Sequence, residues 1–168
     1  MKQLWAPWRM QFITQPRTKG CIFCQFLKQK NDRENLILYR GRSAFIILNK
    51  FPYNNGHLMV VPHRHTAELR KLDSKTDIEM MQLVQKSVDA LKKTMNPQGF
   101  NVGLNLGHAA GAGIVDHLHF HVVPRWVGDT NFMPIFSGDK VMVEYLHETY
   151  DRLHAILHPK IKKSRAKK

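Results

Sequence analysis

Five short segments of the chain are rich in Ile, Leu, Val and Phe, the side chains that favour β-strands. They cover residues 36–39, 44–48, 57–61, 100–106 and 117–123. Gly41 and the Pro-Tyr-Asn-Asn-Gly sequence at 52–56 separate the first three segments, and both are typical of turns. The first three segments are therefore predicted to form an antiparallel meander.

Between residues 74 and 96 the hydrophobic residues recur at steps of three and four, which is the period of an amphipathic helix. They are Ile78, Met81, Val84, Val88, Leu91 and Met95. Ser74 and Asp77 resemble a capping box at the start, and Asn96 followed by Pro97 ends the pattern. The segment predicts one long helix with these hydrophobic residues on its buried face.

Two shorter helical segments are also predicted. One covers about residues 140–157 and would bury Val143, Leu146, Tyr150 and Leu153, and the other is one or two turns at 26–30. The order of the elements predicts an α+β fold, in which an antiparallel sheet of about five strands carries the long helix and the C-terminal helix against one face.

The length of 168 residues is enough for one domain with a single core. We expect that domain to cover residues 21–158. Residues 1–20 contain prolines, a glycine and several aromatic residues, and are expected to form an extended arm. Residues 159–168 are basic and poor in apolar residues, so they are expected to be a disordered tail.

The formal net charge of +13 would by itself favour a nucleic-acid-binding protein. The excess lies at the two ends, because residues 1–31 and 160–168 each carry six basic and no acidic side chains. Residues 32–159 carry 14 basic and 13 acidic side chains. A nucleic-acid partner is therefore not favoured, and the basic ends are expected either to attract polyanions or to aid solubility.

No segment approaches the roughly 20 uninterrupted apolar residues of a membrane span, and the start of the chain lacks the apolar region of a signal peptide. Cys21 and Cys24 are the only cysteines, too few for the disulfide framework of a small secreted domain. The sequence predicts a cytoplasmic protein with no membrane partner.

His117, His119 and His121 alternate with apolar residues in the segment 117–123. Since side chains alternate between the faces of a strand, the three imidazoles are predicted to project from one face. Half-exposed histidines on a solvated face are one explanation, but so regular a triplet favours a functional site. Two chemistries stay open: a catalytic metal held by the histidines, or a nucleophilic imidazole that forms a covalent intermediate.

A glycine-rich loop at 107–113 precedes the histidines, and Arg125 follows them. Glycines let backbone N–H groups approach an anion closely, and an arginine side chain pairs well with phosphate. The combination predicts a phosphate site and favours phosphoryl or nucleotidyl transfer over carbonyl hydrolysis.

The segment from His117 to Val123 resembles the signature of the histidine triad (HIT) family, His-φ-His-φ-His-φ-φ, in which φ is apolar. The resemblance covers about residues 21–126 and includes 45–49, 56–62, 105–107 and 124–125. Residues 4–10 and 125–132 resemble a bacterial branch near the diadenosine polyphosphate hydrolases and phosphorylases. The resemblance implies a HIT-like fold, nucleotidyl-transfer activity and a homodimer.

The resemblance also implies roles for the histidines. His119 matches the nucleophile of the family, which attacks the α-phosphorus and becomes transiently nucleotidylated. His121 would donate a hydrogen bond to a non-bridging α-phosphate oxygen. His117 completes the catalytic set as the first histidine of the triad. His57 would contact the triad histidines without contacting the substrate.

Further positions are implied to bind the substrate. Asn105 would hold the phosphate and Asn49 would contact the ribose, while Phe45 and Ile47 would either line the base or belong to the core. Together with Arg125, these residues form the expected binding site.

The chain departs from the family pattern just before the first histidine. Many members have a glutamine and a small hydroxyl residue there, whereas this chain has Ala-Gly-Ile-Val-Asp at 112–116. We therefore expect the backbone amides of Gly111 and Gly113 to take over part of the phosphate binding.

Cys21 and Cys24 form a Cys-x-x-Cys pair, which alone fits either a redox pair or half of a zinc site. The resemblance to zinc-bearing HIT proteins implies one structural Zn²⁺ per chain, with His65 and His117 as the other ligands and His63 as the competitor of His65. A closed Cys₂His₂ set leaves no position for water, so the metal is expected to hold the fold.

The predicted substrates are dinucleoside polyphosphates such as diadenosine tetraphosphate or triphosphate. Water as the acceptor would make the protein a hydrolase, and inorganic phosphate would make it a phosphorylase. The resemblance of residues 126–132 slightly favours the phosphorylase. The alternatives are a nucleoside phosphoramidase that uses the same His119, and a non-catalytic nucleotide- or RNA-binding protein.

Overall fold

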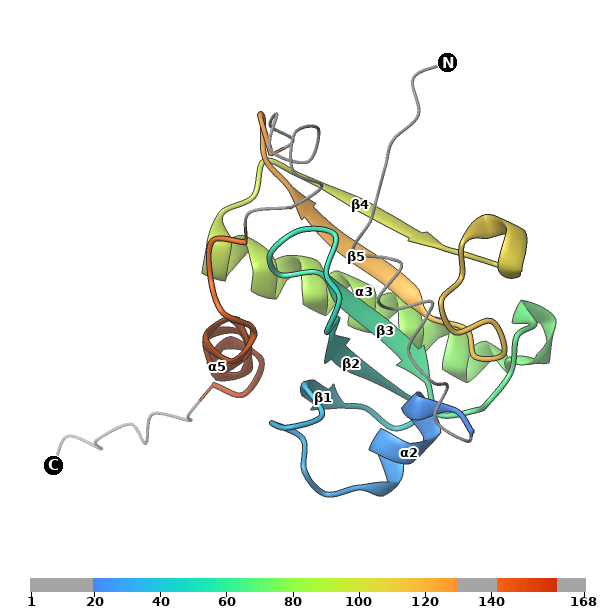
Figure 1. Cartoon of the computed structure of the whole chain (residues 1–168). Helices are drawn as coiled ribbons and strands as arrows, with labels where there is room; N and C mark the ends of the chain where they lie inside the picture. The colour runs from blue at the N-terminus through green and yellow to red at the C-terminus, as the bar shows by residue number, and fades with distance from the viewer. Residues whose placement is uncertain (1–19, 130–141, 160–168) are drawn as a thin grey trace, which may run out of the picture.

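The computed structural model describes residues 20–129 and 142–159, which form one five-stranded antiparallel sheet with helices around it (Figure 1). The strands are β1 (Ile37–Arg40), β2 (Ala44–Leu48), β3 (Leu58–Pro62), β4 (Gly99–Leu104) and β5 (Phe120–Arg125). Their order across the sheet is β1-β2-β3-β5-β4, and every neighbouring pair is antiparallel. The predicted α+β class and the antiparallel sheet are confirmed.

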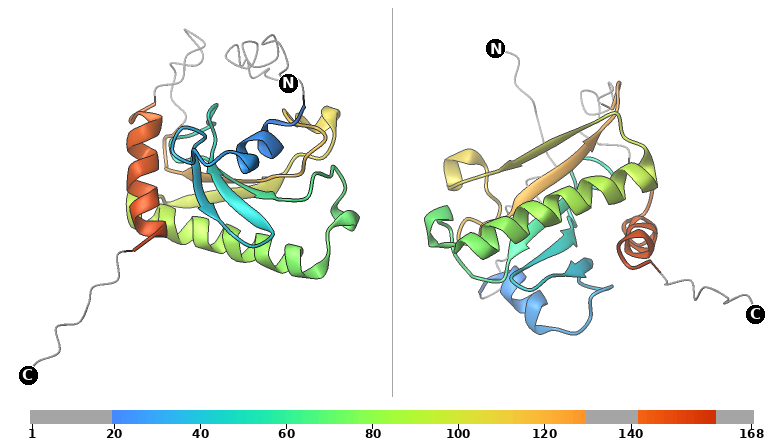
Figure 2. Two further views of the ribbon diagram at one scale, coloured as in Figure 1. Left: turned by 90° about the horizontal axis from the view of Figure 1, so that it is seen from below. Right: turned by 180° about the vertical axis from the view of Figure 1, so that it is seen from behind.

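The helices lie on different sides of this sheet. They are α2 (Ile22–Lys28), α3 (Ser74–Met95) and α5 (Leu146–Leu157), with single 3₁₀ turns η1 (Leu69–Lys71) and η2 (His108–Ala110). Figure 2 shows α3 along one face of the sheet and α2 over the opposite face, while α5 packs beside β1 and one end of α3. Of the two helices expected on one face, α3 packs along the sheet, whereas α5 packs against the edge strand β1 and against α3; α2 lies over the opposite face.

The predicted histidine strand is shorter than expected. β5 begins at Phe120, so that only His121 of the three histidines lies in the strand. β5 pairs with β3 from Leu58 to Val60, and the pairing ends close to Pro62, which has no backbone N–H to continue a ladder. Instead, the Leu118 backbone N–H donates to the Thr66 carbonyl at 2.8 Å.

Helix α3 has the predicted ends but a different buried face. Asp73, not Ser74, caps it, because the Asp73 carboxylate accepts from the Thr76 N–H at 2.8 Å. The predicted burial of Ile78 and Met81 was wrong, since they are 60% and 48% exposed. The buried face is Thr76, Met80, Leu83, Val84, Ser87, Ala90 and Leu91. Small and polar residues make up part of this face. The pattern of hydrophobic residues alone therefore predicted the wrong buried face.

Helix α5 is shorter than predicted because it starts at Leu146. Tyr150 and Leu153 are buried as expected, whereas Val143 precedes the helix and is 84% exposed. The Tyr150 hydroxyl donates to the Ile37 carbonyl at 2.9 Å, which joins α5 to the edge strand β1. The proposed arm and tail lie outside the described residues apart from Gly20 and Pro159.

Among the helices that the structure describes, none is long and apolar enough to cross a membrane.

Candidate active site and metal centre

A cavity of about 500 Å³ lies on the face of the sheet that α2 covers. Its floor is a row of three neighbouring residues from adjacent strands, because Ile47 pairs with Met59 and Met59 pairs with His121. The walls come from α2, from the segments 34–36, 49–53 and 111–114, and from the first turn of α5. Small-molecule sites typically have volumes of about 300–1,000 Å³, so the cavity can hold a nucleotide-sized ligand.

The histidines are far less exposed than a solvated strand face would make them. His117 is 1% and His119 is 5% exposed, and His119 and His121 line the cavity. The explanation of three half-exposed histidines on a solvated face was therefore wrong. The triplet also divides in two, since His119 and His121 face the cavity while His117 faces the two cysteines.

His119 is oriented by its own backbone neighbour. Its Nδ1 lies 2.9 Å from the His117 carbonyl oxygen, which can only accept, so Nδ1 carries the proton. The lone pair is then on Nε2, the nitrogen that can act as a nucleophile. Burial lowers the pKa of His119, with the hydrogen bond to the carbonyl opposing this effect in part, so the imidazole is neutral at pH 7.

A second chain of hydrogen bonds fixes the tautomer of His121. The Tyr53 backbone N–H donates to His57 Nδ1 at 3.1 Å, so the proton of His57 lies on Nε2. His57 Nε2 lies 2.9 Å from His121 Nδ1, which must therefore accept. The proton of His121 is thereby placed on Nε2, as a hydrogen-bond donor. Asn49, whose Nδ2 lies 3.2 Å from His57 Nδ1, belongs to the same network.

Four potential metal ligands converge beside this site. Ligand atoms of Cys21, Cys24, His65 and His117 all lie within 4.8 Å of one another. His117 Nδ1 is 3.2 Å from Cys21 Sγ, 3.7 Å from Cys24 Sγ and 3.2 Å from His65 Nδ1. Bonds of about 2.0–2.3 Å to a tetrahedral Zn²⁺ separate such atoms by about 3.3–3.8 Å, so these residues fit the ion.

The buried His117 is prepared for metal binding. Its Nε2 donates to the Pro62 carbonyl at 2.8 Å, which leaves the lone pair of Nδ1 directed at the cysteines. Burial lowers the pKa of His117 to about 4, so the ring is neutral, as a ligand must be. His63 is not in this group of four and its ring packs against Phe45, which selects His65 between the two candidates.

The other predicted site residues separate into two groups. Asn49, Gly111 and Gly113 line the cavity, whereas Phe45, Asn105 and Arg125 do not. Phe45 is fully buried beneath Phe23 of α2, with the ring centroids 6.3 Å apart, so its prediction as a base-lining residue was wrong and its core interpretation holds.

Arg125 lies in the last position of β5 and is engaged by other residues. Its guanidinium donates to Asp129 at 2.6 Å and to Asn101 at 2.7 Å. Because Asp129 and Asn101 hold its guanidinium at the end of the strand, the Arg125 side chain is not directed at the cavity.

Sequence reasoning missed the contribution of α2. Ile22, Phe23 and Phe26 line the cavity, and the Phe23 ring meets the His119 ring edge to face at 5.4 Å. The signal was present in the hydrophobic residues within and just after the Cys-x-x-Cys pair, which a short helix places beside both the candidate metal ligands and His119.

The fold and site define a class of α+β protein in which a buried histidine at the start of a strand faces a nucleotide-sized cavity. Comparison with protein families matches residues 30–127 to the HIT domain. The AP-4-A phosphorylase of Mycobacterium tuberculosis is 41% identical over 157 residues, which cover 89% of this chain and 80% of that relative. The chain therefore belongs to the histidine triad family and is an enzyme of the HIT type.

Two further proteins extend the comparison. The adenosine 5'-monophosphoramidase of Schizosaccharomyces pombe is 31% identical over 106 residues, covering 63% of this chain and 74% of that protein. The crystal structure of a Zn-bound histidine triad family protein from Mycobacterium smegmatis superposes with a TM-score of 0.65 at 27% identity, covering 82% of this chain and 93% of that one.

Proposed function

We propose that this protein cleaves dinucleoside polyphosphates, such as diadenosine tetraphosphate or triphosphate, through a nucleotidyl intermediate on His119. The observation that carries the proposal is the hydrogen bond from His119 Nδ1 to the His117 carbonyl, which leaves Nε2 as a neutral nucleophile in the cavity. The similarity to the AP-4-A phosphorylase of M. tuberculosis supports this substrate class.

In the first step, His119 Nε2 attacks the α-phosphorus and forms a P–N bond. The bond from that phosphorus to its bridging oxygen breaks, and the remaining nucleoside polyphosphate leaves with the electron pair of the bond. From diadenosine tetraphosphate this leaving group is ATP. The positive charge that develops on the imidazole is stabilised because Nδ1–H already donates to a backbone carbonyl.

In the second step, an acceptor attacks the same phosphorus and releases His119. Water yields AMP, and inorganic phosphate yields ADP. His121 Nε2–H would donate to a non-bridging oxygen of the phosphoryl group in both steps, because His57 fixes its proton on that nitrogen. The backbone amides of Gly111 and Gly113 would assist, and Asn49 would bind the ribose; all three residues line the cavity.

The four-ligand cluster is proposed to bind one structural Zn²⁺. The ligands would be Cys21, Cys24, His65 and His117, and the metal would supply a crosslink between α2 and the segment before β5. Because four protein ligands complete the tetrahedral set, the ion has no position left for a reacting water. The Zn-bound histidine triad protein from M. smegmatis supports the choice of metal.

The family resemblance further supports a homodimer. β4 is an edge strand among those described, and Val102 on it and Met81 on α3 are 46% and 48% exposed. Sedimentation equilibrium at micromolar concentration is expected to give twice the mass of one chain, and a monomer would contradict the assembly.

Cleavage of diadenosine tetraphosphate in ¹⁸O-labelled phosphate tests the function and decides between its variants. Labelled ADP with ATP means phosphorolysis, and AMP with ATP means hydrolysis. An adenosine phosphoramidate tests the second candidate, which the relative from S. pombe favours, because His119 could attack a P–N bond in the same way. Binding without turnover of any of these substrates would contradict the proposed substrate class.

A further inference from the structure

The ring of Tyr53 lies against both members of the histidine pair that determines the proton position of His121. Its centroid is 4.8 Å from that of His57 and 5.8 Å from that of His121, and its plane is inclined by 31° and 34° to the two imidazoles. The Tyr53 backbone N–H also donates to His57 Nδ1 at 3.1 Å. One residue thus contacts the pair with both its ring and its backbone.

The hydrogen bond between His57 and His121 lies at the border between the core and the cavity. His57 is fully buried, whereas His121 and Tyr53 line the cavity. Because the Tyr53 ring covers one side of both imidazoles, removing it would extend the cavity to that side of the pair. Water there could donate to His121 Nδ1 or accept from His57 Nε2, and either contact competes with the bond between them.

The loop that carries Tyr53 is attached to the strand that carries His121. Asn54, the next residue in the chain, is buried, and its Nδ2 donates to the Pro124 carbonyl of β5 at 3.0 Å. The Asn54 carbonyl accepts from the His57 backbone N–H at 3.1 Å. These bonds fix the backbone beside Tyr53 relative to both histidines.

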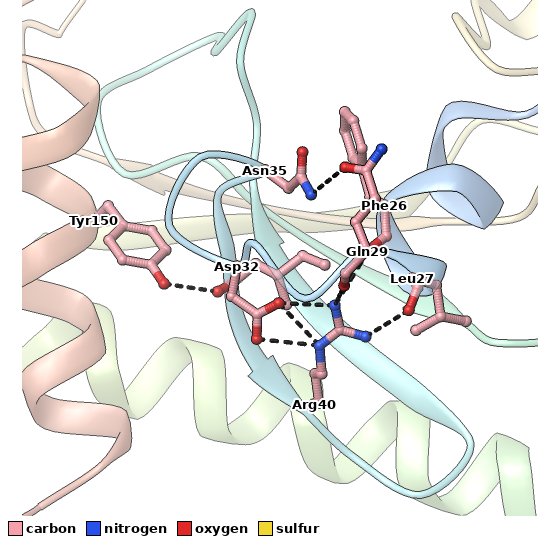
Figure 3. Close-up of polar contacts among 8 residues, drawn as sticks. Phe26, Leu27, Gln29, Asp32, Asn35, Arg40 and Tyr150 are labelled. Atoms are coloured by element: carbon pink, nitrogen blue, oxygen red, sulfur yellow. Dashed lines mark hydrogen bonds and ion pairs between the residues drawn. The ribbon is translucent and has the colours of Figure 1, made fainter.

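The same loop is also attached to helix α5. Asn55 Oδ1 lies 3.2 Å from the hydroxyl of Thr149, which is fully buried. The neighbouring Tyr150 donates from its hydroxyl to the Ile37 carbonyl at 2.9 Å, so α5 is itself fixed to β1 (Figure 3). The position of the Tyr53 ring is therefore set by β5 and α5 and not by the turn alone.

We propose that Tyr53 is a positioning residue for the nucleotidyl transfer, whose ring keeps water away from the His57–His121 hydrogen bond and so keeps the proton on His121 Nε2. The proposal rests on the proposed function, because it takes His121 to be the donor to the phosphoryl group. The contacts with both imidazoles are made by the ring, so phenylalanine is expected to serve equally well. A smaller aliphatic side chain leaves part of the pair uncovered.

Single-turnover cleavage of diadenosine tetraphosphate separates positioning from binding. Tyr53→Phe is expected to keep the rate constant for adenylylation of His119 within about twofold of the wild type. Tyr53→Leu is expected to lower it about tenfold and to change the dissociation constant of the substrate less than about threefold. Tyr53→Met is a second variant, and thermal unfolding checks that each is folded. Tyr145→Leu, which is exposed and outside the cavity, is the matched control and should change neither constant.

Two further measurements show whether Tyr53 acts through His57. In a His57→Leu background, adding Tyr53→Leu should lower the rate constant less than about twofold further, because the bond that the ring shields is already gone. Proton NMR gives a readout without turnover. The His57 Nε2–H is expected to exchange with water at least about tenfold faster in Tyr53→Leu than in the wild type or in Tyr53→Phe.

Equal losses of rate in Tyr53→Phe and Tyr53→Leu overturn the proposal, because the hydroxyl would then be responsible. Weaker binding with an unchanged rate constant also overturns it, since the ring would only contact substrate, and so do additive losses with His57→Leu. If the wild type forms no adenylyl adduct, the proposed function fails separately. The exchange rate still decides the shielding by Tyr53, and an unchanged rate in Tyr53→Leu overturns it.

Discussion

His57 Nε2 lies 2.9 Å from His121 Nδ1, although the two residues are 64 positions apart in the chain. His57 is fully buried and takes its own orientation from the Tyr53 backbone N–H. His57 does not line the cavity, whereas His121 does. His57 thus determines which nitrogen of His121 carries the proton.

Removing this partner is expected to slow the reaction more than it weakens binding. In His57→Leu, His121 loses the partner that places its proton on Nε2, so kcat for diadenosine tetraphosphate should fall about 10²–10³-fold with KM within a few fold. His57→Gln can still donate through its amide and should recover part of the loss. His154→Leu, outside the cavity, is the control. A change in KM alone would contradict the role given to His57.

The metal site can be tested with two neighbouring histidines. His65→Ala should release the metal and lower the melting temperature, because His65 belongs to the four-ligand cluster. His63→Ala should retain one metal per chain, since the His63 ring packs on Phe45 instead. Elemental analysis of the purified variants measures both. Metal retained in His65→Ala and lost in His63→Ala would reverse the assignment.

The wall formed by α2 is expected to act on substrate binding. Phe26→Ala removes an aromatic ring from the cavity, so KM should rise about tenfold while kcat stays within about threefold. Steady-state kinetics separates the two constants. Val127→Ala, at a position that is 88% exposed and outside the cavity, should change neither.

Arg125 and Asp129 are expected to stabilise the fold in a pH-dependent manner. The hydrogen bonds from Arg125 hold the pKa of Asp129 far below its usual 3.8. A carboxyl group with a depressed pKa stabilises the folded state above its unfolded pKa and loses that contribution as the pH falls below it. Asp129→Asn should therefore cost about 1–3 kcal/mol at pH 7 and progressively less below about pH 4.

Urea unfolding between pH 7 and pH 3 measures this effect. Asp89→Asn, on the exposed face of α3, is the matched control and should change stability little at any pH. A loss in Asp129→Asn that stays constant down to pH 3 would show that the charge of Asp129 is not responsible.

The sequence predicted most of the sheet because strand positions are marked by runs of β-branched and apolar residues between turns. The metal cluster was predicted from the resemblance to zinc-bearing HIT proteins, because the Cys-x-x-Cys pair alone fits a redox pair equally well. The exposure of the histidines could not be predicted, because alternation does not reveal that α2 covers this face of the sheet.

Phe45 and Arg125 show the same limit at single positions. Phe45 follows the pattern of a cavity residue, but whether a ring meets ligand or Phe23 depends on a helix from a distant part of the chain. Arg125 stands beside the triad in sequence, and its pairing with Asp129 depends on the turn that follows β5.

The central claim is that His119 becomes covalently nucleotidylated. The most direct measurement is mass spectrometry of protein mixed with diadenosine tetraphosphate, quenched within milliseconds and digested at a pH that preserves P–N bonds. We predict an adenylyl group on the peptide that contains His119 in the wild type, and its absence in His119→Ala. Turnover in the wild type with no adduct at any time, or an adduct that persists in His119→Ala, would contradict the account.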